Sequence, residues 1–149
     1  MAWISITTSE VQTRLTGPEL SAVQQIALAP GQTNPLPELI GQVVDEIRGY
    51  IAAHAANKLG AGSTIPQKLL GAALAMIRYR LATRLPVRSL LTQERTDENR
   101  EAIRLLERVA DGRFKIEEPT QADTETHAAQ SPRIEAPDRD FSRTRQDGV

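Results

Sequence analysis

Residues 36–51, LPELIGQVVDEIRGYI, decide the fold. Their apolar side chains recur at steps of three and four residues, which places them on one face of an α-helix, with the charged side chains off that face. The pattern predicts a helix from Leu36 to about Leu59, ended by Gly60 in the left-handed conformation that glycine adopts at low cost. The apolar face consists of Leu36, Leu39, Ile40, Val43, Val44, Ile47 and Ile51.

The flanking sequence predicts four further helices, each bounded by capping or breaking residues. Threonine and serine cap helix starts, proline suits the first turn, and glycine ends a helix. The first two helices span about 8–15, with Thr8 or Ser9 as cap, and 18–28, which begins with Pro18. The third spans 66–85 and lies between Pro66 and Pro86. The fourth spans 96–111, with Thr96 as cap and Gly112 as its end. Residues 113–116 alternate polar and apolar, as in a short extended segment. The expected fold class is all-α, a small bundle of about five helices with a long extended C-terminal tail.

The composition changes at Glu117. Before this residue the core must be built from Leu, Ile, Val and Ala, because the whole chain has only one Trp, two Tyr and two Phe. After it, apolar residues become sparse and Pro, Ser, Thr, Asp and Glu dominate, which is typical of a segment that cannot fold alone. We predict a helical domain over residues 1–116 and a flexible, acidic docking arm over residues 117–149.

Charge is distributed unevenly along a chain whose net charge is only -1. Residues 66–95 hold six lysines and arginines against one acid, and residues 117–149 hold four arginines against eight acids. A basic face and an acidic arm on one chain favour a contact between them, within one subunit or between subunits. Two independently solvated surfaces are the alternative.

The sequence offers no residue set suited to catalysis, cofactor binding or metal binding. Cysteine is absent, and the two histidines, His54 and His127, lie far apart, with no second ligand one helical turn from His54. The adjacent Asp45 and Glu46 point about 100° apart on a helix, so they cannot act together on one atom. We expect a non-enzymatic protein in which His54 is structural, on the helix surface or partly buried. We expect no membrane span and no secretory signal, because no apolar run approaches the required length.

Arginines at four-residue steps raise the question of nucleic acid. Arg100, Arg104 and Arg108 share one face of the last predicted helix, and we interpret them as surface partners of Glu101 and Glu107. The chain lacks the aromatic residues that stack on single-stranded bases, and its turns do not fit a helix-turn-helix. Sequence-specific DNA binding is not expected.

Four motifs, in this order, resemble the small head–tail connector adaptors of Mu-like phages and prophages. The likeness covers residues 3–116. The motifs are Trp3-Ile4 before a short capped helix, Asp45-Glu46-Ile47-Arg48-Gly49-Tyr50-Ile51, Ile77-Arg78-Tyr79-Arg80-Leu81 in a proline-led helix, and the run from Arg100 to Gly112. The chain departs from the family pattern at Ala53-His54-Ala55, where an arginine–tyrosine pair is usual, and no family motif maps onto the arm.

The resemblance implies a ring, expected to be a dodecamer, stacked beneath the portal protein in the virion neck. Such adaptors are assembled in the host cytoplasm, bind the next neck or tail-completion protein, and extend the channel through which packaged DNA passes without sequence-specific binding. The arm would dock on a partner. The residues expected to contact a neighbouring subunit or the portal are Arg78, Arg80, Arg84, Arg88, Glu117, Glu118, Arg133 and Phe141. The alternative function is a small DNA-binding regulatory protein of a mobile element that uses the basic 66–108 surface.

Overall fold

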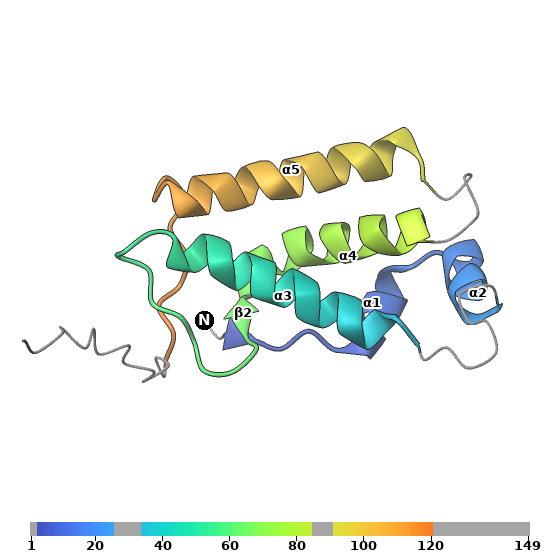
Figure 1. The fold of residues 1–149 in the computed structure, drawn as a ribbon, viewed down its shortest axis with the longest axis horizontal. Coiled ribbons are helices and arrows are strands. Elements are labelled where there is room, and N and C mark those ends of the chain that lie inside the picture. Colours follow the sequence, from blue (N-terminus) through green and yellow to red (C-terminus); the bar gives the residue numbers. More distant parts are fainter. Residues whose placement is uncertain (1–2, 26–33, 85–90, 121–149) are drawn as a thin grey trace, which may run out of the picture.

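The computed structural model describes residues 3–25, 34–84 and 91–120, and it confirms the all-α fold class (Figure 1). The helices are α1 (Thr8–Arg14), α2 (Gly17–Gln25), α3 (Leu36–Ala52), α4 (Leu70–Arg84) and α5 (Gln93–Ala110). A single turn of 3-10 helix, Gln67–Leu69, leads into α4. Two short strands, β1 (Trp3–Ile4) and β2 (Ile65–Pro66), pair antiparallel, with Trp3 opposite Pro66 and Ile4 opposite Ile65.

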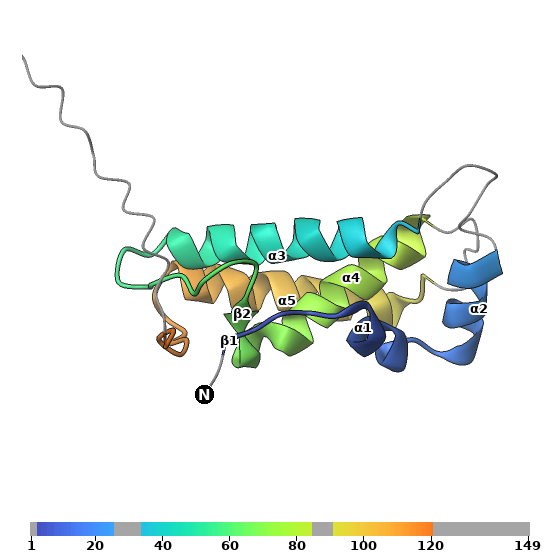
Figure 2. The same ribbon diagram turned by 90° about the horizontal axis from the view of Figure 1, so that it is seen from below.

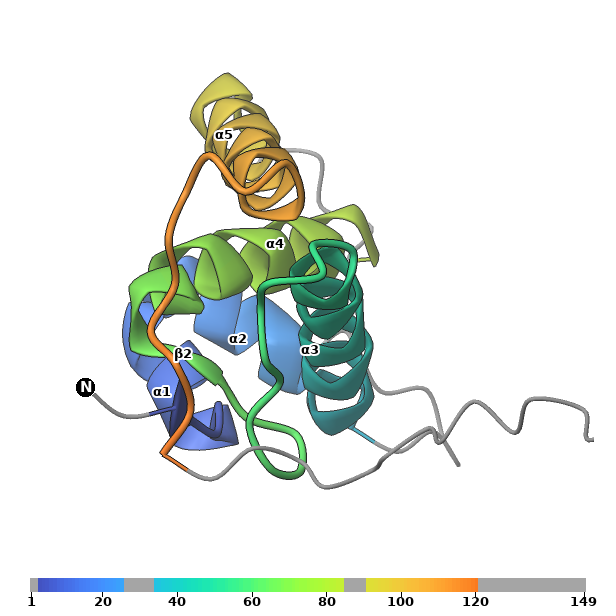
Figure 3. The ribbon, with the colours of Figure 1, turned by 90° about the vertical axis from the view of Figure 1, so that its left-hand side faces the viewer.

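Helix α4 is the centre of the bundle. It packs against α1, α3 and α5, which lie around it on three sides (Figure 3). The strand pair lies beside the start of α4, and α2 lies at one end of the molecule (Figure 2). The core is built from aliphatic side chains, and the seven apolar residues that predicted α3 are all buried. Burying a side chain of this kind contributes about 1.5–3 kcal/mol relative to leaving it exposed.

Helix α3 ends at Ala52, seven residues before the predicted end at Leu59. The chain turns away because the Asn57 side chain donates a hydrogen bond to the Ile51 carbonyl at 3.3 Å and so satisfies a C-terminal acceptor. Gly60 is not the left-handed cap that was predicted, since among the described residues only Gly62 and Gly112 have positive φ. It is a glycine for a different reason: a Cβ there would lie 2.5 Å from the Trp3 ring.

Two predicted helix caps were also wrong by a few residues. Helix α5 starts at Gln93 because Thr92, not Thr96, has the extended backbone of an N-cap and accepts a hydrogen bond from the Arg95 N–H at 3.4 Å. Helix α1 is capped by Thr7, through a reciprocal pair of hydrogen bonds with Glu10, and not by Thr8 or Ser9.

The end of α5 is as predicted. Gly112 stops it with φ of +73°, and the Arg113 N–H then bonds to the Arg108 carbonyl at 2.8 Å. Residues 113–116 are not part of a strand, although their alternation is real, because Phe114 and Ile116 pack against the core and Arg113 and Lys115 are exposed. The predicted helix residues 26–28, Pro86 and most of the 29–35 loop lie outside the described residues.

Candidate partner-binding surface

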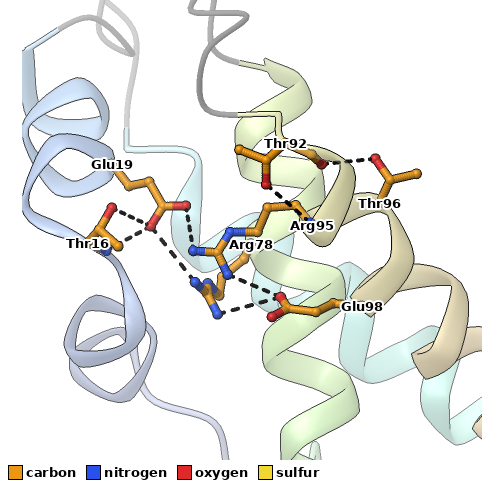
Figure 4. A network of polar contacts seen from close by, with 7 residues as sticks. All are labelled: Thr16, Glu19, Arg78, Thr92, Arg95, Thr96 and Glu98. Atoms are coloured by element: carbon orange, nitrogen blue, oxygen red, sulfur yellow. Dashed lines mark hydrogen bonds and ion pairs between the residues drawn. The ribbon is translucent and has the colours of Figure 1, made fainter.

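A buried ion-pair network joins α2, α4 and α5 (Figure 4). Glu19 of α2 is its centre and, within the described ranges, is the one charged residue classed as buried, with 6% of its surface exposed. Its carboxylate oxygens lie 3.2 Å from Arg95 and 4.0 Å from Arg78. Glu98 lies 3.1 Å from Arg95 and 3.8 Å from Arg78. Each arginine therefore bridges two carboxylates, and together they hold three helices in place.

The charge of Glu19 is fixed by its surroundings. The residue before α2, Thr16, donates to it from the backbone N–H at 2.7 Å and from the hydroxyl at 2.9 Å. Burial raises the pKa of Glu19, but these hydrogen bonds and the charges of Arg95 and Arg78 outweigh burial, so the pKa lies below its ordinary value of 4.5. Sequence reasoning missed Glu19, although the Thr16-x-x-Glu19 spacing is that of a capping box and would have indicated it.

The four arginines predicted to bind a partner differ in their surroundings. Arg78 is only 17% exposed at its side chain and belongs to the network just described. Arg80 forms an ion pair with Glu46 that joins α4 to α3. Arg84, in the last turn of α4, is exposed and forms no ion pair with a described residue, while Arg88 lies outside the described residues. Arg78 and Arg80 thus have a role within the fold, and partner binding by all four stays a prediction.

The arginine stripe of α5 is only partly neutralised. Arg100 pairs with Asp97 at 2.9 Å rather than with Glu101, which neighbours it in sequence but points about 100° away on the helix. Arg104 and Arg108 are exposed and form no ion pair within the described part of the chain. The interpretation of these two as paired surface residues was therefore wrong: Arg104 and Arg108 are exposed beside Glu101 and Glu107, which also form no ion pair with a described residue.

The root of the arm is attached to the opposite end of the chain. The Trp3 indole N–H donates to the Glu117 carbonyl at 3.0 Å, and the Lys68 ammonium lies 3.5 Å from the Glu117 carboxylate. That carboxylate is 12% exposed, and neither of its oxygens accepts a hydrogen bond from a described residue. Glu118 is exposed, and Arg133 and Phe141 lie outside the described residues. The arm therefore starts at a defined corner, beside β1 and the start of α4.

His54 lies on the turn after α3, half-buried, and lines a small pocket of about 280 Å³ together with Lys58, Lys115 and Glu117. Its ring lies against Gly112, where a Cβ would come within 2.3 Å of Nε2. In the ranges that the structure describes, no three side chains from His, Cys, Asp and Glu gather in a way that suits a metal ion. None of the helices in those ranges has the length and apolarity that a membrane span needs.

A larger hollow, here called the α4–α5 groove, opens between these two helices and α1. Its volume is about 480 Å³. Gly71, Ala75 and Arg78 of α4 form one side of it, and Leu105 of α5 and Arg14 of α1 form others. Its floor is apolar because small residues line it, and its rim carries charge.

Comparison with known proteins identifies the family. Residues 6–134 match the family model described as "Bacteriophage Mu, Gp36", which is 129 of the 149 residues. The match extends beyond the helical domain into the arm, where no family motif had been recognised. No curated protein and no solved structure matches the chain. The chain therefore belongs to the bacteriophage Mu Gp36 family and is a structural or assembly protein of a Mu-like phage.

Proposed function

We propose that this protein is a non-enzymatic subunit of the virion neck, forming a ring adaptor between the portal and the tail. The ring, expected to be a dodecamer, would extend the channel for packaged DNA, help to retain that DNA, and bind the next neck or tail-completion protein. The observation that carries the proposal is the match to the Mu Gp36 family across both the helical body and part of the arm.

The distribution of charges within the helical body supports a role in lateral assembly. The charges that lie between helices are matched within the chain, as the Glu19 network and the Arg80–Glu46 pair show. The outer face of α5 instead exposes Arg104 and Arg108 without partners in the described residues. Charges of this kind are available to a complementary surface, and identical subunits that pack head to tail through complementary patches close into a ring when the rotation allows.

The fixed root of the arm supports a role in docking. Because Glu117 is held by Trp3 and Lys68, whatever follows it starts from one place on the body. An arm with an anchored root loses less orientational freedom on binding than one that leaves from a mobile end. We propose that the arm, with Glu118, Arg133 and Phe141, contacts the portal or a neighbouring subunit.

Arg84 provides the cleanest test of the basic surface. Reversal of charge at Arg80 would break its ion pair with Glu46, so a loss of binding could result from a less stable fold. Arg84 forms no ion pair with a described residue, so its replacement tests binding alone. We expect Arg84→Glu to weaken ring or portal binding while the unfolding midpoint stays unchanged. Thr83→Glu, on the neighbouring exposed position, is the matched control. Normal ring and portal binding by Arg84→Glu would remove Arg84 from the interface.

The role itself is tested by electron microscopy of particles made when this gene carries an early stop codon. Separate tails beside DNA-filled or leaking heads are the expected result, because heads without the adaptor cannot join tails. Normal joined virions would contradict the proposal. The exposed Arg104 and Arg108 would then favour the DNA-binding regulator, whose binding to duplex DNA must fall steeply with salt because phosphate contacts release counterions.

A further inference from the structure

The central helix α4 has one uncovered side. α1, α3 and α5 pack around it (Figure 3). The α4–α5 groove lies on the remaining side, lined by residues of α1, α4 and α5. Gly71 is exposed there and Ala75 is half-exposed, and Leu105 of α5 is also only partly buried. An apolar hollow of about 480 Å³ lies within the size range of sites that bind ligands or peptide side chains.

The groove also carries arginine N–H groups that are not fully paired. Arg14, in the last turn of α1, is exposed and forms no ion pair with a described residue, and the buried Nε of Arg78 donates to no described acceptor. Arg14 and Arg78 line the groove together with Glu98 and Glu101, while Arg95 and Glu19 lie behind it in the network. Burial and the charge of Arg95 lower the pKa of Arg78, and Arg14 lowers it further, while Glu19 and Glu98 oppose this shift. An additional carboxylate in the groove would give Arg14 and the Nε of Arg78 an acceptor.

We propose that the groove binds residues 134–141 of the chain's own arm, with the sequence IEAPDRDF. This segment supplies three carboxylates, and it contains two of the three large apolar residues that follow Thr120, namely Ile134 and Phe141. Either apolar side chain suits the small-residue floor, and a neighbouring carboxylate suits Arg14 and the free Nε of Arg78.

The start of the arm lies close to the groove. Glu117 contacts Lys68, which is three residues before Gly71 at one end of the groove. The 14 steps from residue to residue between Thr120 and Ile134 span up to about 46 Å when extended, so the segment reaches the groove easily. A short tether of this kind gives an effective concentration in the millimolar range, so a weak contact within one chain outcompetes contacts between chains.

This contact can be tested apart from the connector role, although it bears on how the proposed docking arm is controlled. A subunit whose arm covers its own groove would release the arm only when a stronger partner competes. The stop-codon experiment tests the connector role in the phage, and the experiments below use the isolated full-length protein, so either proposal can fail alone.

The first experiment is disulfide crosslinking, for which the absence of native cysteine gives a clean background. Ala75→Cys in the groove is combined with Ala136→Cys in the arm, and the protein is oxidised mildly at low concentration. We expect an intramolecular disulfide in a monomer. The control pair is Gly41→Cys with Ala136→Cys, because Gly41 is exposed on α3, on a different side of α4. The proposal is overturned if the control pair crosslinks equally well or if no disulfide forms. Disulfide-linked dimers would also overturn it and would indicate that the groove binds the arm of a second copy.

The second experiment tests the charge requirement by limited proteolysis. Trypsin cuts after Arg139, inside the bound segment, and we expect Arg14→Glu to raise the rate of this cut roughly five-fold, as for loss of one ion pair of about 1 kcal/mol. Arg104→Glu is the matched control, because it makes the same change of charge on the exposed face of α5, away from the groove. Equal rates for the two variants would overturn the role of Arg14.

Discussion

Replacement of Glu19 by glutamine tests whether the buried network holds α2, α4 and α5 together. Glutamine keeps the shape of the side chain and removes its charge. The two hydrogen bonds from Thr16 then become neutral, at a loss of about 1 kcal/mol each. Arg78 and Arg95, with side chains only 17% and 16% exposed, keep Glu98 as their one counter-charge. Loss of one member of a buried pair costs about 3–5 kcal/mol when nothing compensates, and Glu98 compensates in part. We expect a total loss of about 3 kcal/mol in the free energy of unfolding.

The chain supplies a matched control for this change. Glu10 accepts hydrogen bonds from the backbone N–H and the hydroxyl of Thr7 at 2.8 and 3.0 Å, the same local arrangement that Glu19 makes with Thr16. Glu10 is exposed and forms no ion pair with a described residue. Because water can replace these exposed hydrogen bonds, they contribute less than the buried pair at Glu19, and we expect Glu10→Gln to cost less than about 1 kcal/mol in total. The assay is urea unfolding at neutral pH, followed by the helical circular dichroism signal. Equal losses for the two variants would refute the reasoning, because the cost would then come from capping alone.

The same pair predicts a pH dependence. Because the folded-state pKa of Glu19 lies below 4.5, its contribution to stability is present above that pH and is lost as the pH falls through the lowered value. The Glu19→Gln variant should therefore lose less stability than the unsubstituted protein on acidification below about pH 4.5. Parallel curves would show that the Glu19 carboxylate contributes nothing through its charge.

Two further substitutions test the corrected ends of the helices. Gly60→Ala places a Cβ 2.5 Å from the Trp3 ring and must displace the indole. We therefore expect a loss of about 1–3 kcal/mol in the free energy of unfolding and a red shift of the fluorescence of the single tryptophan. The control, Gly49→Ala, adds a Cβ to open space inside α3 and should raise the free energy of unfolding by up to about 1 kcal/mol. Thr92→Ala removes the cap of α5 and should lower the free energy of unfolding by about 1 kcal/mol, whereas Thr96→Ala should lower it by less. Thermal unfolding measures both losses. A larger loss for Thr96→Ala than for Thr92→Ala would show that Thr96 is the cap.

The elements that could be predicted are those whose signal is local. The apolar period of residues 36–51 predicted α3, because a buried helical face leaves its mark on the same residues that form it. Gly112 ended α5 as expected, since a stop of this kind needs only the conformational freedom of glycine. The caps were harder to place, because threonines stand at several positions near each helix start and hydrogen bonding selects among them only in the folded chain.

The features that were missed depend on residues distant in sequence. Trp3 pairs with Pro66 and donates a hydrogen bond to Glu117. These contacts join segments that are far apart in the sequence, so no short sequence pattern predicts them. The same holds for the basic run in α4. Its net charge suggested a free surface, but Arg80 meets Glu46 from another helix, so a count along the sequence overestimated the charge left for a partner.

The bond between Trp3 and Glu117 has a mechanical consequence. Because the indole holds the Glu117 carbonyl and Lys68 holds its side chain, tension applied to the arm would be shared between the backbone that leads back to α5 and the contacts with β1 and the start of α4. The central helix would receive part of the pull directly, at the corner where both ends of the described body meet. A pull on the arm would therefore load the middle of the fold as well as the last turn of α5, and peeling of α5 residue by residue would first require these contacts to break.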